Sequence, residues 1–279
     1  MTAMPGAALD RPVSEAPWDG WQPAFLGAFE ARVQRADSLV RFALGFAHRG
    51  AMAVLWSERA RFLHPSERRY AESLAQSTRR ETFVLGRYAL KRALARLASS
   101  AFLPSEVEVA RGVFGQPVVH HWPSPPAVSI THAGDLAFAV ACDPGHVVGI
   151  DFDLLLPECD PTRQRALSER EREMARPWEL SEPHLALVSW TMKEALSKAL
   201  RSGLMASFEL LALEGASREG ATFSAEFSNF RQYRACAWQL GDATLALVLP
   251  KHSRLVLETD ELARLRGLVN LPRAAALAR

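Results

Sequence analysis

Two carboxylates that could bind a divalent cation stand two residues apart in the apolar stretch that begins at Val148. Side chains alternate along a β-strand, so a strand here would place Asp151 and Asp153 on the same face. Paired carboxylate oxygens suit a hard ion such as Mg²⁺. The pair alone is a weak signal, because a solvent-facing strand edge can carry the same pattern.

A second set of reactive side chains lies on a predicted helix around Trp190. At about 100° per residue, one arc of this helix collects Trp190, Lys193, Glu194, Ser197 and Lys198. The opposite arc is apolar and predicts the core-facing side: Val188, Met192, Ala195, Leu196 and Ala199. A lattice of i,i+4 ion pairs on a solvated surface would also explain the charged arc. A tryptophan among these charges favours a binding or catalytic site.

These two groups lie in strings that resemble the two signature motifs of the Sfp-type 4'-phosphopantetheinyl transferases. GIDFD at Gly149–Asp153 is similar to G-I/V-D-I/V/L-E/D, and WTMKEALSK at Trp190–Lys198 is similar to W-S/T-x-K-E-A/S-x-x-K. Three further stretches follow family elements in order: FGQP at Phe114–Pro117, SITHA at Ser129–Ala133 and LSERE at Leu167–Glu171. The likeness covers roughly Arg59 to Pro250, and the ordered set is far more specific than any single motif.

The chain departs from the family pattern at several positions. Thr131 stands where serine is common, which preserves a hydroxyl, and Gln116 stands where lysine is frequent, which removes a basic contact to the nucleotide. Asp153 replaces a common glutamate. Because its side chain is one methylene shorter, it would reach a metal ion through a water molecule.

The resemblance implies a magnesium-dependent transferase. It would move the 4'-phosphopantetheine arm of coenzyme A to a serine of an apo acyl or peptidyl carrier protein and release 3',5'-ADP. The carrier serine would attack the β-phosphorus directly, without a covalent enzyme intermediate. Its proton would pass to Glu194 or to a metal-bound water, while Glu171 would either orient Lys193 or share the role of base.

The resemblance also implies roles for named residues. Asp151, Asp153 and Glu194 would hold Mg²⁺, Lys193 and Lys198 would offset phosphate charge, and the catalytic set would be Glu194, Asp151, Lys198 and His132. The coenzyme would be bound by the following residues: Arg80, Arg87, Lys91, Gln116, Pro117, Thr131, His132, Lys193 and Lys198. Within this set, His132 would contact the pyrophosphate. Arg80, Arg87 and Lys91 are the candidates for the 3'-phosphate, with Arg87 preferred.

The elements that must position these residues repeat along the chain. The predicted helix 84–97 (VLGRYALKRALARL) is similar to the predicted helix 188–200 (VSWTMKEALSKAL) when Lys91 is aligned with Lys193. A second match follows each helix, between Gly134–Val140 and Gly241–Leu247. Two matches in the same order indicate two halves of similar architecture. The sequence therefore predicts an α+β fold of two similar halves. The resemblance implies a pseudo-dimer in which each half is a long helix on a small antiparallel sheet, with the active site in the cleft between them.

Short apolar runs predict the strands of these sheets at 107–109, 127–130, 136–141, 223–227 and 245–249. The turn at Cys142–His146 contains Asp-Pro-Gly and predicts the boundary between the halves. The expected organisation is a flexible extension at 1–22, a basic nucleotide-binding half at 23–144 and a metal-binding, catalytic half at 145–279.

The composition limits the classes of ligand and partner that the protein is expected to bind. The net charge is only +2, yet basic residues crowd one region: Arg59, Arg61, Arg68, Arg69, Arg79, Arg80, Arg87, Lys91, Arg92 and Arg96. An anionic ligand is expected there, and nucleic acid is disfavoured because the protein is nearly neutral and lacks a nucleic-acid motif. No apolar run approaches the roughly 20 residues of a membrane span, so no membrane partner is expected.

Localisation and oligomeric state are further expectations. Three widely spaced cysteines and no secretory signal favour a reducing cytoplasm. A cleft built by two halves of one chain favours a monomer. Two alternatives remain at this stage: a non-catalytic module that binds carrier proteins, and a metal-dependent phosphohydrolase, which would require a histidine-rich or additional acidic motif.

Overall fold

The computed structural model describes residues 25–35, 38–98, 102–122, 124–155, 161–257 and 259–271. The predicted extension at residues 1–22 lies outside these ranges. Within them, helices and antiparallel sheets form two halves, which confirms the predicted mixed α+β class.

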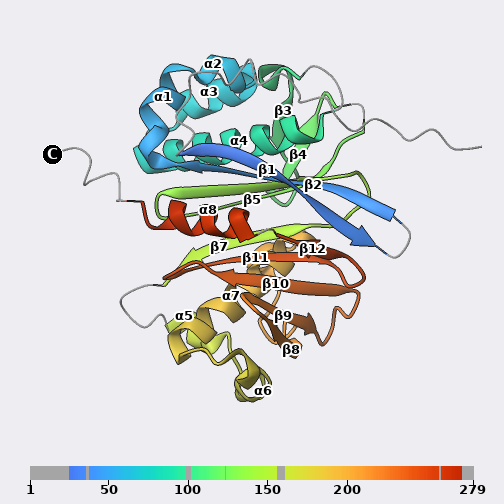
Figure 1. Ribbon diagram of the computed structural model, residues 1–279. Helices are drawn as coiled ribbons and strands as arrows, with labels where there is room; N and C mark the ends of the chain where they lie inside the picture. Colours follow the sequence, from blue (N-terminus) through green and yellow to red (C-terminus); the bar gives the residue numbers. More distant parts are fainter. Residues whose placement is uncertain are drawn as a thin grey trace, which may run out of the picture.

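The first half is built on a five-stranded antiparallel sheet whose outer face is covered by helices (Figure 1). The strand order is β12-β1-β2-β6-β5. The strands are β1 Leu26–Arg35, β2 Ser38–His48, β5 Ala127–Ala133, β6 Leu136–Cys142 and β12 Arg254–Val256. The helices are α1 Met52–Ser57, α2 Arg59–Phe62, α3 Pro65–Ser73 and α4 Ser77–Leu97. A small separate sheet pairs β3 Glu108–Arg111 with β4 Pro117–His120.

The second half is built on another five-stranded antiparallel sheet, in the order β7-β11-β10-β9-β8. Its strands are β7 Gly149–Leu154, β8 Leu213–Glu219, β9 Thr222–Phe227, β10 Tyr233–Gln239 and β11 Ala243–Pro250. Its helices are α5 Pro161–Arg165, α6 Glu169–Met174 and α7 Glu182–Leu200. Short 3-10 turns lie at η2 Arg49–Ala51, η3 Pro104–Glu106, η4 Arg176–Trp178 and η5 Gly203–Met205.

The C-terminal segment returns to the first half. Strand β12 pairs antiparallel with β1, so that Arg32 faces Val256 and Gln34 faces Arg254. The helix α8 Thr259–Val269 then packs beside the two sheets, with Leu265 and Leu268 in their shared core. Residues between 254 and 269 therefore contact both halves.

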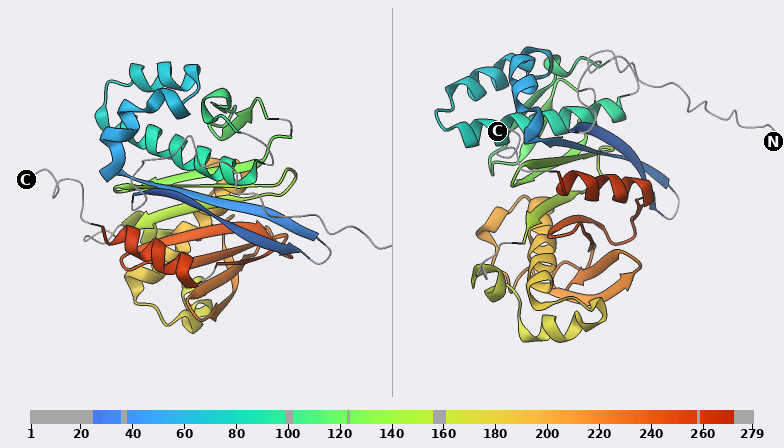
Figure 2. Two further views of the ribbon diagram at one scale, coloured as in Figure 1. Left: turned by 45° about the horizontal axis from the view of Figure 1, so that its top comes forward. Right: turned by 60° about the vertical axis from the view of Figure 1, so that its left-hand side comes forward.

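The molecule has four layers, helix, sheet, sheet and helix (Figures 1 and 2). Helix α4 packs on the first sheet and α7 packs on the second. Between the sheets lies a core of large apolar side chains that includes Phe42, Phe46, Phe138, Phe152 and Leu247. Among the described residues, no helix combines the length and the apolarity needed to cross a bilayer.

Each long helix crosses its sheet at a glycine. A Cβ atom on Gly45 of β2 would lie 2.0 Å from the carbonyl oxygen of Ala89, and one on Gly149 of β7 would lie 2.0 Å from that of Ala195. Only a residue without a side chain permits such an approach between a helix backbone and a strand. The glycine of the GIDFD string thus sets how closely α7 packs on β7.

A buried glutamate–lysine pair also recurs in both halves. Lys91 Nζ of α4 lies 3.2 Å from Glu67 Oε2, and Lys193 Nζ of α7 lies 2.6 Å from Glu171 Oε1. All four side chains are buried. The aligned lysines of the sequence repeat therefore occupy matching, internal positions.

The two glutamates have matching backbone partners as well. Glu67 accepts hydrogen bonds from the amides of His64 and Val109, and Glu171 accepts them from the amides of Ser168 and Leu213. In each half the carboxylate thus completes a capping box at the start of a short helix and holds the chain near the next strand.

The second sequence match corresponds to two β-hairpins. Gly134 joins β5 to β6 with φ of 55°, and Gly241 joins β10 to β11 with φ of 67°. Tight hairpin turns require such left-handed backbone, which glycine adopts without strain. The repeat in the sequence is therefore a repeat of helix and hairpin in the structure.

Replacing Gly149 by alanine should destabilise the fold. The added methyl group would meet the Ala195 carbonyl, and overpacking of this kind costs about 1–3 kcal/mol or more. Urea denaturation followed by circular dichroism measures the change. Gly267→Ala is the matched control, because a Cβ there meets nothing within 4 Å and alanine is the better helix former by about 1 kcal/mol. Equal stabilities of the two variants would contradict the close approach.

Candidate active site

The edge strands β5 and β7 meet where the halves join, and side chains of β5 bind the backbone of β7. Ser129 Oγ accepts the Ile150 amide at 3.2 Å, and Thr131 Oγ1 accepts the Phe152 amide at 3.1 Å. Both hydroxyl residues are buried. Strand β7 is an edge strand of the second sheet, so these bonds supply partners for backbone amides that no neighbouring strand pairs. Asp151 lies between Ile150 and Phe152 in the sequence and is therefore held at the junction.

Asp151 is buried and is bound by groups from both halves. Its Oδ1 accepts a hydrogen bond from Thr131 Oγ1 at 2.9 Å and one from Lys198 Nζ of α7 at 2.6 Å. Charge-assisted bonds of this kind are shorter and stronger than bonds between neutral groups. The predicted catalytic residues Asp151 and Lys198 are therefore brought into direct contact.

Glu194 lies on α7 near the same carboxylate. Its Oε1 is buried and has no hydrogen-bond partner within the described residues. Burial raises the pKa of Glu194 to about 7, the charges of Asp151 and Asp153 add to the increase, and Lys198 opposes it. A carboxylate in this state can accept a proton near neutral pH or can bind a cation.

Asp153 forms an ion pair with Arg163. Its Oδ2 accepts a hydrogen bond from Arg163 Nη2 of α5 at 2.7 Å, and its Oδ1 accepts the Leu154 amide at 2.8 Å. Burial raises the pKa of Asp153, although Arg163 acts in the opposite direction. No sequence pattern predicts a role for Arg163.

The three predicted metal ligands do not gather as one centre. Within the described residues, no group of three or more His, Cys, Asp or Glu side chains has the spacing of a metal site. Lys198 and Arg163 hold Asp151 and Asp153 instead. The donor set still fits Mg²⁺ in part, because Asp151 and Glu194 supply oxygen atoms and Glu194 Oε1 is buried without a partner.

The prediction that Lys193 offsets phosphate charge is contradicted. Its side chain is 1% exposed, and its ammonium group binds Glu171 Oε1 at 2.6 Å and the Ala166 carbonyl at 2.5 Å. Although burial opposes ionisation, bonds from Leu213 and Lys193 hold the pKa of Glu171 below its usual value. The helical arc of the sequence therefore divides: Glu194 and Lys198 reach the site, whereas Lys193 and Ser197 are buried.

A cavity of about 580 Å³ opens beside the junction and is lined by cations. Its basic lining residues are Arg79, Arg87, Arg111 and His132. Arg87 lies over the ring of Phe83 at 4.6 Å, with its Nε 3.1 Å from Glu67 Oε1. The predicted anion-binding residues Arg87 and His132 thus line one space.

Two other predicted 3'-phosphate ligands lie elsewhere. Lys91 is fully buried and donates hydrogen bonds to the carbonyls of Pro104 and Val107, so it cannot reach a ligand in this structure. Burial lowers its pKa to about 8. Arg80 does not line the cavity, and its guanidinium stacks on Trp56 at 5.0 Å. The helical pattern identified basic positions but did not separate Arg87, which lines the cavity, from Arg80 and Lys91, which do not.

His132 belongs to the exposed part of the site. Its side chain lies on β5 at the cationic cavity. Partial removal of water lowers the pKa of His132, and the nearby Lys198 charge lowers it further. The neutral imidazole that results at pH 7 can donate one hydrogen bond.

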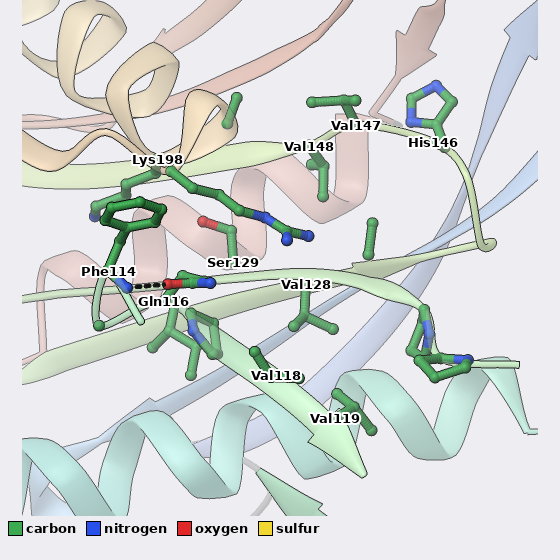
Figure 3. Close-up of a pocket in the computed structure, with 18 of the residues that line it drawn as sticks. Phe114, Gln116, Val118, Val119, Val128, Ser129, His146, Val147, Val148 and Lys198 are labelled. Carbon is green, nitrogen blue, oxygen red and sulfur yellow. Dashed lines mark hydrogen bonds between the residues drawn. The ribbon is translucent and has the colours of Figure 1, made fainter. Parts of the chain in front are cut away.

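A second cavity, of about 530 Å³, continues from the first and is lined by both apolar and polar side chains (Figure 3). Gly115, Pro117 and Ile130 line both spaces. Figure 3 shows Lys198, Gln116 and Phe114 at one end of this cavity. Its valine lining comes from both halves: Val118, Val119, Val128, Val147 and Val148. Gln116 and Pro117 therefore lie in the site, although Gln116 Oε1 accepts the Phe114 amide at 3.0 Å.

The sequence carried a partial signal for the residues that it missed. Arg111 stands directly before the turn that contains Phe114–Pro117, so its place at the cavity could have been inferred from that turn. Arg79 was included only as a member of the basic cluster. Arg163 had no signal, because its contact with Asp153 depends on how the chain folds back after β7.

Two protein-family models match consecutive parts of the chain. Residues 147–252 match the model of the 4'-phosphopantetheinyl transferase superfamily, and residues 66–142 match the model of the 4'-phosphopantetheinyl transferase N-terminal domain. No individual curated protein matches. The two matches are consecutive and together span more than half of the chain. The chain belongs to the 4'-phosphopantetheinyl transferase superfamily and is a transferase of that class.

Lys193 and Lys198 should respond differently to replacement by methionine. Lys193→Met leaves Glu171 buried beside an apolar chain, so it should cost about 3–5 kcal/mol of stability without a specific change in KM for coenzyme A. Lys198→Met should lower the thermal midpoint less than Lys193→Met, because Lys198 is 28% exposed, and should reduce kcat/KM by about two orders of magnitude. Calorimetry and steady-state kinetics measure the two effects.

A double variant keeps the test usable if Lys193→Met does not fold. Glu171→Met with Lys193→Met removes both buried charges and should recover much of the lost stability. If Lys193→Met were as stable as the wild type and raised KM for coenzyme A, Lys193 would be a phosphate ligand after all.

Glu194→Gln should abolish a divalent-cation effect on stability. In chelator, the wild type carries a buried and unpaired carboxylate, so Glu194→Gln should be equally or more stable. Mg²⁺ with coenzyme A should raise the melting temperature of the wild type and leave that of Glu194→Gln nearly unchanged. Glu169→Gln is the control, because its side chain is 94% exposed. A full Mg²⁺ response in Glu194→Gln would exclude this residue as a ligand.

Proposed function

We propose that this protein transfers the 4'-phosphopantetheine arm of coenzyme A to a serine of an apo acyl or peptidyl carrier protein. The observation that carries the proposal is the continuity of a cationic cavity and an apolar cavity past the junction of Asp151, Lys198 and Glu194. A ligand with a phosphorylated nucleotide at one end and a long, weakly polar arm at the other fits this succession. Membership of the superfamily supports the same reaction.

The nucleotide end belongs in the cavity lined by arginine. Arg79, Arg87 and Arg111 present guanidinium groups to the 3'-phosphate, and guanidinium groups bind phosphate in a two-pronged geometry. The pantetheine arm then lies along the valine-lined cavity. The pyrophosphate between them is placed near His132, which donates a hydrogen bond to it, and Lys198, which offsets its charge.

The reaction is a single displacement. The carrier serine Oγ forms a bond to the β-phosphorus while the bond from that phosphorus to the bridging oxygen breaks, and 3',5'-ADP leaves with the electron pair. Glu194 accepts the serine proton through the carboxylate oxygen that does not bind the cation. Asp151 and Glu194 would hold Mg²⁺, which when bound offsets the charge of the phosphates.

The two halves act as a pseudo-dimer within one chain. The matching glutamate–lysine pairs, crossing glycines and hairpins support this interpretation. Because one chain supplies both sides of the cleft, the active species is a monomer. The three widely spaced cysteines of the sequence are consistent with a location in the reducing cytoplasm.

A direct assay tests the proposal. The protein is incubated with coenzyme A, Mg²⁺ and a panel of apo carrier proteins, and intact mass spectrometry measures addition of the phosphopantetheine arm. We expect modification of at least one carrier, with the activity in the monomeric fraction after size exclusion. The absence of transfer to every carrier, with coenzyme A still bound, would favour a non-catalytic binding module instead.

Replacing Arg111 by alanine should distinguish coenzyme A from dephospho-coenzyme A. Loss of a charged contact to the 3'-phosphate should raise KM for coenzyme A about tenfold, in line with the usual strength of hydrogen bonds to charged groups, and should scarcely change KM for dephospho-coenzyme A. Arg80→Ala is the matched control, because Arg80 stacks on Trp56 away from the cavity. An equal effect of Arg111→Ala on both substrates would remove Arg111 from the 3'-phosphate site.

A further inference from the structure

The carboxylate of Asp153 is engaged on both of its oxygen atoms. Arg163 Nη2 binds Oδ2 at 2.7 Å, and the Leu154 amide binds Oδ1 at 2.8 Å. The side chains of Arg163 and Asp153 are 11% and 22% exposed, so this ion pair is largely shielded from water. A shielded pair of this kind is costly to open, because each charge would be left without its partner.

Arg163 is also anchored to the strand that carries Asp153. Its Nη1 donates to the Leu154 carbonyl at 2.7 Å. The planar guanidinium therefore binds the side chain of Asp153 and the backbone of the next residue together, a geometry that lysine cannot reproduce in full. This two-point contact connects α5 to the end of β7 and holds the Asp153 carboxylate against α5.

Within the described residues, each of the other two acidic residues keeps one carboxylate oxygen without a hydrogen-bond partner: Glu194 Oε1, which is buried, and Asp151 Oδ2. Asp151 is bound on Oδ1 by Lys198 and Thr131. Proteins commonly hold Mg²⁺ through one or two carboxylates and leave the remaining positions to water and substrate phosphates. Two carboxylates are therefore sufficient here.

We propose that Arg163 is a positioning residue that keeps Asp153 out of the ligand set of the metal, so that Asp151 and Glu194 are the carboxylates that bind it. The inference rests on the proposed magnesium-dependent function and departs from the three-carboxylate set that the sequence motif predicts. Its consequence is a metal site that depends on the phosphates of coenzyme A for its remaining ligands. The second acidic residue of the GIDFD string then serves the structure of the β7–α5 connection.

Binding of Mn²⁺, used as a paramagnetic substitute for Mg²⁺, tests the inference without reference to activity. Electron paramagnetic resonance measures the Kd of Mn²⁺ for the full chain in the presence of coenzyme A, and Mg²⁺ competition shows that the two ions share the site. Asp153→Asn should keep the Kd within about twofold of the wild type, because Asp153 is not a ligand. Arg163→Met should tighten binding about tenfold, because it releases a carboxylate beside the ion. Arg163→Lys, which retains the charge, should stay near the wild type.

The double variant Arg163→Met with Asp153→Asn removes both charges and serves if Arg163→Met does not fold. Its Kd should again lie within about twofold of the wild type. A tenfold loss of affinity in Asp153→Asn or in the double variant would show that Asp153 binds the ion, and would overturn the inference, as would an unchanged Kd in Arg163→Met. If the wild type with bound coenzyme A binds no Mn²⁺, the magnesium part of the proposed function fails first, and this inference fails with it.

Discussion

The hydroxyl group of Thr131 is the point at which the two halves and the acidic site depend on each other. Its oxygen accepts a hydrogen bond from the Phe152 amide, and its O–H group donates a hydrogen bond to Asp151 Oδ1. Buried amides at a sheet edge are costly without a partner, so this bond and the parallel one from Ser129 hold β7 against β5. The same contact that joins the sheets therefore orients the carboxylate, and the site cannot shift without opening the junction.

Buried charge stabilises the long helices in a comparable way. Each helix carries a lysine that is paired with a glutamate from the preceding short helix, and each glutamate is also bound by amides on both sides of the helix. Each buried carboxylate is therefore bound by a lysine and two amides. These bonds fix the long helix, the N-cap of the short helix and the following strand relative to one another. The glycines at Gly45 and Gly149 allow each helix to approach closely enough for these bonds. The position of Glu194, next to Lys193 on α7, follows from that anchoring.

The cleft separates its chemistry along its length. Guanidinium groups from α4 and β3 line one cavity, and valine side chains from both halves line the other. Lys198 lies at the second cavity and is bound to Asp151. A phosphorylated ligand can therefore be neutralised at its nucleotide end while its reacting phosphorus is presented to the acidic group. The arrangement requires both halves, since residues of each line the second cavity.

The sequence by itself determined the α+β class, the repeat of helix and hairpin, the family and the acidic residues at the junction, because these depend on local periodicity, on glycine turns and on motifs that are contiguous in the chain. Of the residues that it named, Asp151 and Lys198 are in contact, and Arg87 and His132 line one cavity. It could not decide which basic residues of a helix face a cavity: Lys91 and Lys193 share their helical arcs with exposed residues, yet partners from distant segments, Glu67 and Glu171, draw them into the core. Nor could it pair Asp153 with Arg163 or bring β12 back to β1. Those outcomes were decided by the tertiary structure alone, because the free energy of a buried charge depends on the partner that folding places beside it rather than on the neighbours that it has in the chain.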